Sequence, residues 1–318
     1  MRRNAGKKRF GVLVLAVAAA GALATGISAA TPKPLRGTIT ADGSSTVGPW
    51  TTAAAEAFQR KNRGVRITVG ISGTGGGFER FCRSETDLSN ASRPIRNSEH
   101  LRCLESGVRW LALHVANDGI TVVVNRDNTW VDCLTTAELK KIWDTGSKVN
   151  NWSEVRAGFP NVPLKLFGPG TDSGTFDFFT EVINGRSRRS RADYQASEDD
   201  NILVQGVAGE RGGMGYFGLS YYEENRSRLK ALRIDSGRGC VAPSSQTVQA
   251  GTYKPLGRPL FVYAKRSSFR RAEVAAFLGY ALNNQATIAQ RAAFVALTKK
   301  QATKARASFR RALKQIFG

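Results

Sequence analysis

Residues 43–46 read Gly43-Ser44-Ser45-Thr46, and this stretch runs directly into an amphipathic helical pattern that begins near Pro49. Residues 73–77 (GTGGG) and 172–175 (DSGT) have the same form and also lead into helical patterns. The first turn of a helix leaves backbone N–H groups without partners and carries a partial positive charge. Glycine lets a ligand oxygen approach closely, and hydroxyl groups add further donors. If the three helix starts converge, they form a pocket for an anion.

Strand-like and helical patterns alternate along the rest of the chain. Strand patterns cover residues 67–71, 111–115, 121–124, 164–167 and 260–263, and further helical patterns cover residues 136–143, 272–282 and 302–317. This alternation predicts an α/β fold, in which ligands bind at the loops between strands and helices. The last helix is apolar on one side and cationic on the other. We expect Phe309, Leu313 and Ile316 to dock on the core, and contact with a membrane surface is the alternative.

The first thirty residues have the pattern of a signal peptide rather than of a folded element. Five cations precede residue 10, residues 11–24 are nearly all apolar, and residues 28–30 (SAA) are small. We therefore predict a signal peptide over residues 1–30, and an exported protein that resides in the periplasm or outside the cell envelope. The apolar run is short for a membrane span, and a retained anchor is the alternative.

The composition limits the classes of function. The net charge of +22 attracts anions, but the basic residues are scattered and form no nucleic-acid-binding motif, so we expect no nucleic acid partner. The two histidines, His100 and His114, belong to no recognisable catalytic triad or ligand cluster. Residues 170–174 also lack the G-x-S-x-G spacing of a nucleophilic serine. We therefore expect no metal, no cofactor and no enzymatic activity, with a secreted phosphatase-type hydrolase as the alternative.

Five motifs, taken in order, resemble the PstS family, the phosphate-binding subunit of the bacterial high-affinity phosphate ABC transporter. They are residues 41–47 (ADGSSTV), 72–78 (SGTGGGF), 90–95 (NASRPI), 172–177 (DSGTFD) and 215–218 (GYFG). The resemblance implies a two-lobed type II periplasmic-binding-protein fold with a hinge and an interlobe cleft. It also implies a monomer that holds inorganic phosphate without covalent chemistry and delivers it to ABC transporter permease subunits. Binding of another oxyanion, such as sulfate or molybdate, or a role as a phosphate sensor or adhesin, is the alternative.

The resemblance carries phosphate-binding roles onto residues of the three clusters, which are Ser44, Ser45, Thr46, Thr74, Gly75, Ser173, Gly174 and Thr175. Many relatives have an arginine just ahead of the third cluster, whereas residues 168–172 here read GPGTD. We expect Arg93 to supply the missing cation through a forked contact with two phosphate oxygens. A surface arginine in a loop is the alternative.

Asp172 is the candidate that would distinguish phosphate from sulfate. A phosphate that carries a proton can donate it to a carboxylate, whereas fully ionised sulfate has no proton to donate. Asp172 could equally cap its helix or pair with Arg93. Asp42 is an alternative acceptor.

The chain order predicts that lobe 1 consists of residues 31–117 and 250–318, and lobe 2 of residues 118–249. Two segments, near residues 115–120 and 246–251, would cross between them. The four cysteines show no Cys-x-x-Cys spacing, which argues against a zinc site, and export favours disulfides. We predict the pairs Cys82–Cys103 and Cys133–Cys240, because each pair then lies within one lobe. Four free thiols are the alternative.

Overall fold

The computed structural model describes residues 34–171, 173–197 and 199–317. The predicted signal peptide and Asp172 therefore lie outside the described residues. The strands are β1 (Gly37–Gly43), β2 (Val65–Val69), β3 (Leu88–Ala91), β4 (Trp110–Asn125), β5 (Cys133–Thr135), β6 (Lys165–Pro169), β7 (Gln195–Ser197), β8 (Gly213–Gly218), β9 (Leu229–Ala231), β10 (Arg233–Asp235), β11 (Cys240–Val241) and β12 (Gly257–Lys265). The helices are α1 (Gly48–Lys61), α2 (Gly73–Cys82), α3 (Asn97–Glu105), α4 (Thr136–Trp143), α5 (Trp152–Val155), α6 (Gly174–Asn184), α7 (Asp200–Gly209), α8 (Leu219–Glu224), α9 (Ser245–Ala250), α10 (Ala272–Asn283), α11 (Gln285–Arg291) and α12 (Lys299–Phe317), with a 3-10 helix at Arg266–Arg270.

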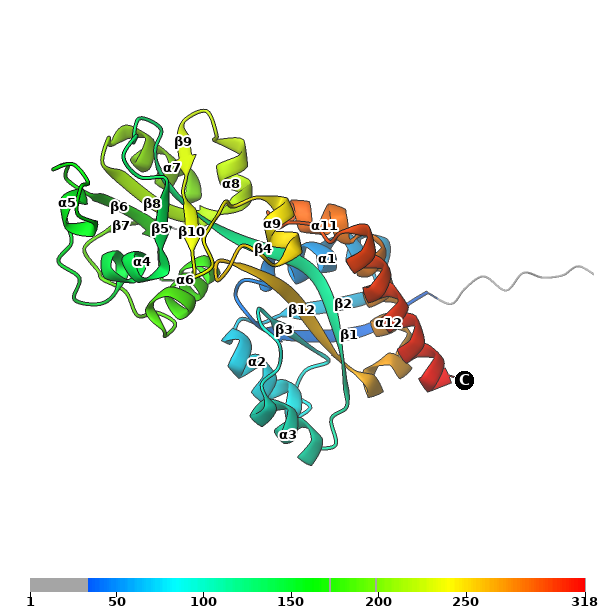
Figure 1. Cartoon of the computed structure of the whole chain (residues 1–318). Helices are drawn as coiled ribbons and strands as arrows, with labels where there is room; N and C mark the ends of the chain where they lie inside the picture. The colour runs from blue at the N-terminus through cyan, green and yellow to red at the C-terminus, as the bar shows by residue number, and fades with distance from the viewer. Residues whose placement is uncertain (1–33, 172, 198, 318) are drawn as a thin grey trace, which may run out of the picture. The chain divides into compact units, whose positions relative to one another are not determined.

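One mixed sheet extends through most of the described chain. Its strand order is β2-β1-β3-β12-β4-β8-β6-β7, and β9 also pairs with β4. The strands β2, β1 and β3 are parallel, as are β8, β6 and β7, whereas β12 runs antiparallel to both of its neighbours. Because parallel strands need crossover connections, helices such as α1, α2 and α6 follow the strands at their carboxyl ends (Figure 1).

Strand β4 connects the two parts of this sheet. Its 16 residues pair with β12 over residues 110–119, and with β8 and β9 over residues 120–125. The sequence analysis predicted two separate strands here, at residues 111–115 and 121–124, on either side of the polar stretch Asn117-Asp118-Gly119. In the structure these polar groups have partners: Asn117 Oδ1 lies 3.0 Å from His114 Nε2, and Asp118 pairs with Arg258 of β12. The strand therefore continues through the polar stretch, as Figure 1 shows.

The two largest hydrophobic cores of the described residues lie along this sheet. The first includes Trp50, Phe58 and Phe277, and its members come from residues 39–116 and 260–312. The second includes Trp143, Trp152 and other residues from positions 120–256. We call the elements around the first core lobe 1 and those around the second lobe 2. The residue limits predicted for the two lobes stay a prediction.

Strand β4 and the chain just before β12 are joined by hydrogen bonds, a few residues beyond the segment predicted near residues 246–251. The backbone N–H of Ile120 donates to the carbonyl of Leu256 at 2.9 Å, and Tyr253 Oη donates to the carbonyl of Ile120 at 2.9 Å. Both interactions are buried, because Ile120, Tyr253 and Leu256 are fully covered. The chain thus returns to lobe 1 beside the point where β4 leaves it.

Helix α12 packs on lobe 1. Phe309 is buried against Phe269 with ring centroids 5.6 Å apart, and Leu313 and Ile316 pack against the same core. The predicted docking of this helix is therefore confirmed. In the part of the chain that the structure describes, no helix has the length and apolar character needed to cross a membrane.

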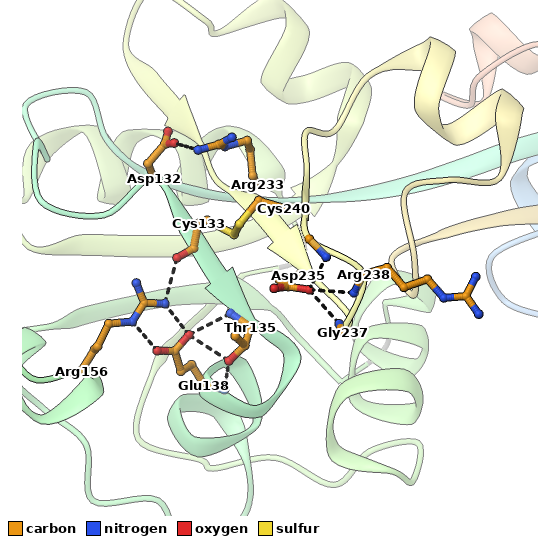
Figure 2. Close-up of a disulfide and its surroundings, with 11 residues drawn as sticks. Asp132, Cys133, Thr135, Glu138, Arg156, Arg233, Asp235, Gly237, Arg238 and Cys240 are labelled. Atoms are coloured by element: carbon orange, nitrogen blue, oxygen red, sulfur yellow. Dashed lines mark hydrogen bonds and ion pairs between the residues drawn. A yellow bond between two sulfur atoms is a disulfide. The ribbon is translucent and has the colours of Figure 1, made fainter.

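Both predicted disulfides are present, so the alternative of four free thiols is wrong. Cys82–Cys103 joins α2 to α3 within lobe 1 and is fully buried. Cys133–Cys240 joins β5 to β11 at the edges of a three-stranded sheet in lobe 2. Figure 2 shows this bridge beside the Arg156–Glu138 ion pair, and Arg156 Nη2 also donates to the carbonyl of Cys133 at 3.1 Å.

Candidate functional site

Three helix starts meet at one cavity between the lobes. Helices α1 and α2 of lobe 1 begin at Gly48 and Gly73, and α6 of lobe 2 begins at Gly174. The cavity between the loops that precede them has a volume of about 390 Å³. Among the residues predicted to bind the anion, its lining contains Ser44, Ser45, Thr46, Thr74, Gly75, Arg93 and Gly174. The structure thus brings these residues together, and their contact with a ligand stays a prediction.

A second cavity of about 220 Å³ adjoins the first. It shares Ser45, Thr46 and Gly174 with the first cavity and adds Ser173 and Thr175, the other two predicted residues that the structure describes. Asp118 of β4 also lines it. The third predicted cluster therefore faces both cavities.

The buried carboxylate of Asp42, at the end of β1, holds the first two loops together. Its Oδ1 atom accepts hydrogen bonds from the backbone N–H groups of Gly43 at 2.7 Å and Ser72 at 3.1 Å, and its Oδ2 atom accepts one from Arg80 at 2.8 Å. The loops also need glycine, since a Cβ atom on Gly43 would lie 2.2 Å from the carbonyl oxygen of Asn90. Asp42 is not part of either cavity lining, so it positions the loops from behind.

The ends of the helices differ in how their N–H groups are satisfied. Ser173 Oγ accepts a hydrogen bond from the N–H of Thr175 at 3.2 Å and so caps α6. By contrast, Val47 and Ser72, which directly precede α1 and α2, form no side-chain cap.

At α1 the N–H of Gly48 already donates to the carbonyl of Ser44 at 2.9 Å, and Pro49 has no N–H. The uncapped first turn of α2 is therefore better placed than that of α1 to offer N–H groups to a ligand oxygen. Thr74 Oγ1 contacts Ser92 Oγ at 3.1 Å, which places a second hydroxyl beside the second loop.

Arg93 lines the cavity, but its forked edge faces a carboxylate of its own lobe. Its Nη1 and Nη2 atoms donate to Glu99 Oε2 and Oε1 at 2.8 and 2.7 Å. This hydrogen bonding raises the pKa of Arg93. Burial raises the pKa of Glu99, but the hydrogen bonds from Arg93 and from the backbone N–H of Arg96 outweigh it, so the pKa lies below its ordinary value. The forked contact expected for phosphate is thus made to Glu99 in this structure.

Arg258 is a cavity arginine that the sequence analysis missed. It lies in β12 directly opposite Asp118 of β4, and both side chains are more than nine-tenths buried, with 7 % and 8 % exposed. Its Nη2 atom donates to Thr46 Oγ1 at 2.6 Å, and its Nε and Nη2 atoms each lie 3.3 Å from Asp118 Oδ2. Burial lowers the pKa of Arg258 to about 10, so the guanidinium is still charged at neutral pH.

The flat face of Arg258 contacts lobe 2. Its Cζ atom lies 3.3 Å from the centroid of the Phe178 ring, on α6. In the sequence, the one sign of a buried Arg258 was its place at the start of a mainly apolar strand, Gly257–Lys265. Because polar residues in strands usually face solvent, this signal alone did not point to a ligand.

The mouth of the cavity contains charged residues that the sequence analysis also missed. They include Arg96, Asp177, Glu181 and Arg186. Arg96 of lobe 1 lies 3.7 Å from Glu181 of lobe 2, and both side chains are largely exposed, so this pair stabilises contact between the lobes only weakly.

The lining of the two cavities consists largely of hydrogen-bond donors. Across the described ranges, no group of three His, Cys, Asp or Glu side chains could hold a metal ion. The described residues that line the two cavities include neither histidine nor cysteine. The lining instead offers backbone N–H groups, hydroxyl groups and guanidinium groups, which are the donors that hold an oxyanion.

A family model described as a PBP superfamily domain matches residues 28–285. The chain therefore belongs to the PBP superfamily, and the predicted two-lobed α/β fold is confirmed. It is 50% identical over 278 residues to protein SphX of Synechococcus elongatus, covering 86% of this chain and 82% of that protein. It is also 38% identical over 272 residues to the phosphate-binding protein PstS of Staphylococcus saprophyticus, covering 84% of this chain and 82% of that protein. The resemblance to the PstS family is thereby confirmed.

Solved structures agree with this assignment. The crystal structure of a possible phosphate binding protein from Planctomyces limnophilus is similar with a TM-score of 0.85 and 46% identity, covering 88% of this chain and 99% of that one. An ABC-type phosphate transport receptor from Vibrio cholerae has a TM-score of 0.64 at 19% identity, covering 81% of this chain and 99% of that one. The second likeness concerns the fold alone.

Proposed function

We propose that this protein is an exported solute-binding protein that captures inorganic phosphate between its lobes and delivers it to the permease subunits of an ABC importer. The observation that carries this proposal is the cavity of about 390 Å³, where two uncapped helix starts, the start of α6 and the buried Arg258 converge. Relatives named phosphate-binding protein PstS support phosphate as the anion.

The binding is non-covalent. A dehydrated phosphate needs many donors at once, and the N–H groups of the first two loops, with Ser45, Thr46 and Thr74, supply them from lobe 1. Ser173, Gly174 and Thr175 supply donors from lobe 2. The described lining offers no histidine to activate a hydroxyl group and no cysteine nucleophile. We therefore infer that the protein binds phosphate without turning it over.

The same ligand closes the two lobes. Donors from both lobes reach one ion only when the lobes are together, so phosphate has a higher affinity for the closed state and shifts the population toward it. The predicted limits put residues 31–117 and 250–318 in lobe 1 and residues 118–249 in lobe 2. Since the second core includes Tyr253 and Leu256, we place the return to lobe 1 after Leu256. A permease can then distinguish the loaded monomer by its shape.

Export and selectivity complete the proposal. The two disulfides suit an oxidising compartment, which supports a signal peptide over residues 1–30 and a place in the periplasm or outside the envelope. We retain Asp172 as the acceptor for the proton of phosphate. Replacing Asp172 with asparagine is then expected to let sulfate compete more effectively.

Calorimetry tests the proposed function. The protein, purified after expression of the full chain and stripped of ligand, is titrated with phosphate and then with sulfate. We expect saturable binding of phosphate that sulfate does not block. Removing the Thr74 hydroxyl with Thr74→Val is expected to weaken phosphate binding by about tenfold or more, because a hydrogen bond to a charged group is worth about 1.5–3 kcal/mol.

Thr303→Val, an exposed change on α12, is the matched control and is expected to bind phosphate as the wild type does. Preference for sulfate over phosphate, or hydrolysis of a phosphate ester by the purified protein, would overturn the proposed function.

A further inference from the structure

One side chain touches both lobes beside the point where the chain passes between them. Arg258 belongs to β12, where the chain re-enters lobe 1, and it pairs with Asp118 on the neighbouring β4. From there its Nη2 atom reaches Thr46 in the first loop of lobe 1 at 2.6 Å. Its flat face lies on Phe178 of lobe 2, with Cζ 3.3 Å from the ring centroid.

The contact with Phe178 depends on how the lobes are placed. Asp118 and Arg258 are opposite each other in one sheet, so their pairing survives a movement of the lobes. Phe178 is on α6, close to the helix start that faces the anion cavity. A rotation that separated α6 from the first loop would take Phe178 away from the guanidinium.

The structure has the two loops in direct contact. Thr46 Oγ1 donates to the carbonyl of Gly174 at 3.1 Å, and a Cβ atom on Gly174 would lie 2.6 Å from the backbone nitrogen of Thr46. The first loop of lobe 1 and the start of α6 therefore touch in this structure, and Arg258 lies over Phe178 in the same arrangement.

We propose that Arg258 couples anion binding to lobe closure. Its charge attracts phosphate in the cavity that it lines, Asp118 fixes its position on the crossing strands, and its contact with Phe178 is gained when the lobes close. This inference rests on the proposed function, because it assigns a role in phosphate binding. Arg258 is thus a positioning residue for closure as well as a part of the cavity lining.

The physical reason lies in the shape of the guanidinium. Its edge donates hydrogen bonds within a plane, while its face stays free to stack on an aromatic ring. Arginine can therefore hold Asp118 and Thr46 with its edge and Phe178 with its face. Lysine has the same charge but no flat face, so it cannot serve all three contacts.

Phe178→Leu gives the sharpest test, because it removes the aromatic face and leaves the buried ion pair intact. Phosphate affinity is measured by calorimetry, association and dissociation rates by stopped flow, and closure by the fall in radius of gyration when phosphate is added. We expect Phe178→Leu to weaken binding about tenfold, through faster dissociation, and to reduce the change in radius. Phe178→Tyr retains a ring and is expected to restore both properties.

Arg258→Lys tests the other side of the contact. A double variant combines Arg258→Lys with Phe178→Leu. If Arg258 acts through Phe178, this double variant loses little more phosphate affinity than Arg258→Lys alone, because the stacking contact is already absent. Purely structural damage would instead lower the melting temperature of the unliganded protein and leave the ratio of dissociation to association rates unchanged.

Phe159→Leu is the matched control. It removes another arginine–aromatic contact of lobe 2, in which Arg156 Cζ lies 4.9 Å from the Phe159 ring centroid, and Phe159 is absent from the described lining of both cavities. If the wild type binds and closes, and Phe178→Leu does so equally, the coupling role is wrong and phosphate binding stands. If the wild type binds no phosphate, the proposed function itself fails.

Discussion

At the scale of single residues, a partner decides what a cavity arginine can do. Arg93 and Arg258 both line the cavity, and both already pair with a carboxylate. Glu99 accepts from both terminal nitrogens of Arg93, whereas Asp118 and Thr46 share the edge of Arg258 and its face lies on Phe178. Glu99 is also buried and accepts a hydrogen bond from the backbone N–H of Arg96 at 2.8 Å, so it orders the start of α3. The Arg93–Glu99 pair therefore contributes to the stability of lobe 1 whether or not an anion is bound.

Glu99→Gln is expected to lower the free energy of unfolding by about 2 kcal/mol at pH 7, because the half-buried Arg93 loses its counter-charge. The pKa of Glu99 lies below its ordinary value of 4.5 in the folded protein. Its ionised form therefore stabilises the fold above that value, and this contribution is lost as the pH falls through the folded pKa. Urea unfolding at several pH values should show the difference between the two proteins shrinking below about pH 4.5.

Glu105→Gln at the exposed end of the same helix provides the control, and we expect no such pH-dependent difference. A Glu99→Gln difference that is as large at pH 3 as at pH 7 would show that the loss comes from packing rather than from charge.

At the scale of elements, the three helix starts could be predicted because their signals are local. Each has glycine and hydroxyl residues beside an apolar helical pattern, and α1, α2 and α6 begin at Gly48, Gly73 and Gly174 accordingly. Arg258 could not be predicted in this way. Its partners Asp118 and Thr46 lie 140 and 212 residues away along the chain, so its burial depends on contacts that no local pattern records.

Two errors in the predicted elements have the same origin. Helix α3 was missed because it buries only Glu99 and Cys103, which leaves little apolar periodicity. The prediction divided β4 at Asn117-Asp118-Gly119, because polar residues and glycine usually mark a turn. In α3 the buried positions are held by an ion-paired glutamate and a disulfide cysteine, and in β4 Asp118 pairs with Arg258, 140 residues away. In both places, polar pairing or a disulfide replaces the apolar pattern on which sequence reasoning depends.

The two disulfides differ in exposure, and this difference predicts the order in which they are reduced. Cys82 and Cys103 are fully buried between helices, whereas Cys240 is exposed on the short strand β11. Thiol exchange requires a thiolate to reach one of the sulfur atoms. A mild reductant should therefore open Cys133–Cys240 first.

Alkylation of the freed thiols in the native protein, followed by peptide mass spectrometry over time, measures that order. The unfolded protein is the control, since both bridges are then accessible and should react at similar rates. Earlier labelling of Cys82 and Cys103 in the native protein would contradict the burial argument.

At the scale of the whole molecule, closure depends on how closely the loops of the two lobes approach. Gly174→Ala would place a methyl group 2.6 Å from the backbone nitrogen of Thr46. Overpacking of this kind costs about 1–3 kcal/mol, which corresponds to a loss of roughly 5- to 150-fold in affinity if only the closed state is affected. We expect phosphate affinity to fall by that factor in calorimetry, with little change in the stability of the unliganded protein.

Gly209→Ala is the matched control, because nothing lies within 4 Å of a Cβ atom at that position, and it should bind phosphate normally. Wild-type affinity in Gly174→Ala would mean that the lobes bind their ligand without approaching as closely as they do in this structure.

Strand β4 also has a consequence for how the protein unfolds. Its residues 110–119 carry the hydrogen bonds of lobe 1 and its residues 120–125 those of lobe 2, within one unbroken strand. If the pairing of β4 is lost in one lobe, the end of the strand that pairs in the other lobe is no longer held in place. Heating should consequently melt both cores in a single cooperative transition, with one calorimetric peak, instead of releasing the lobes one after the other.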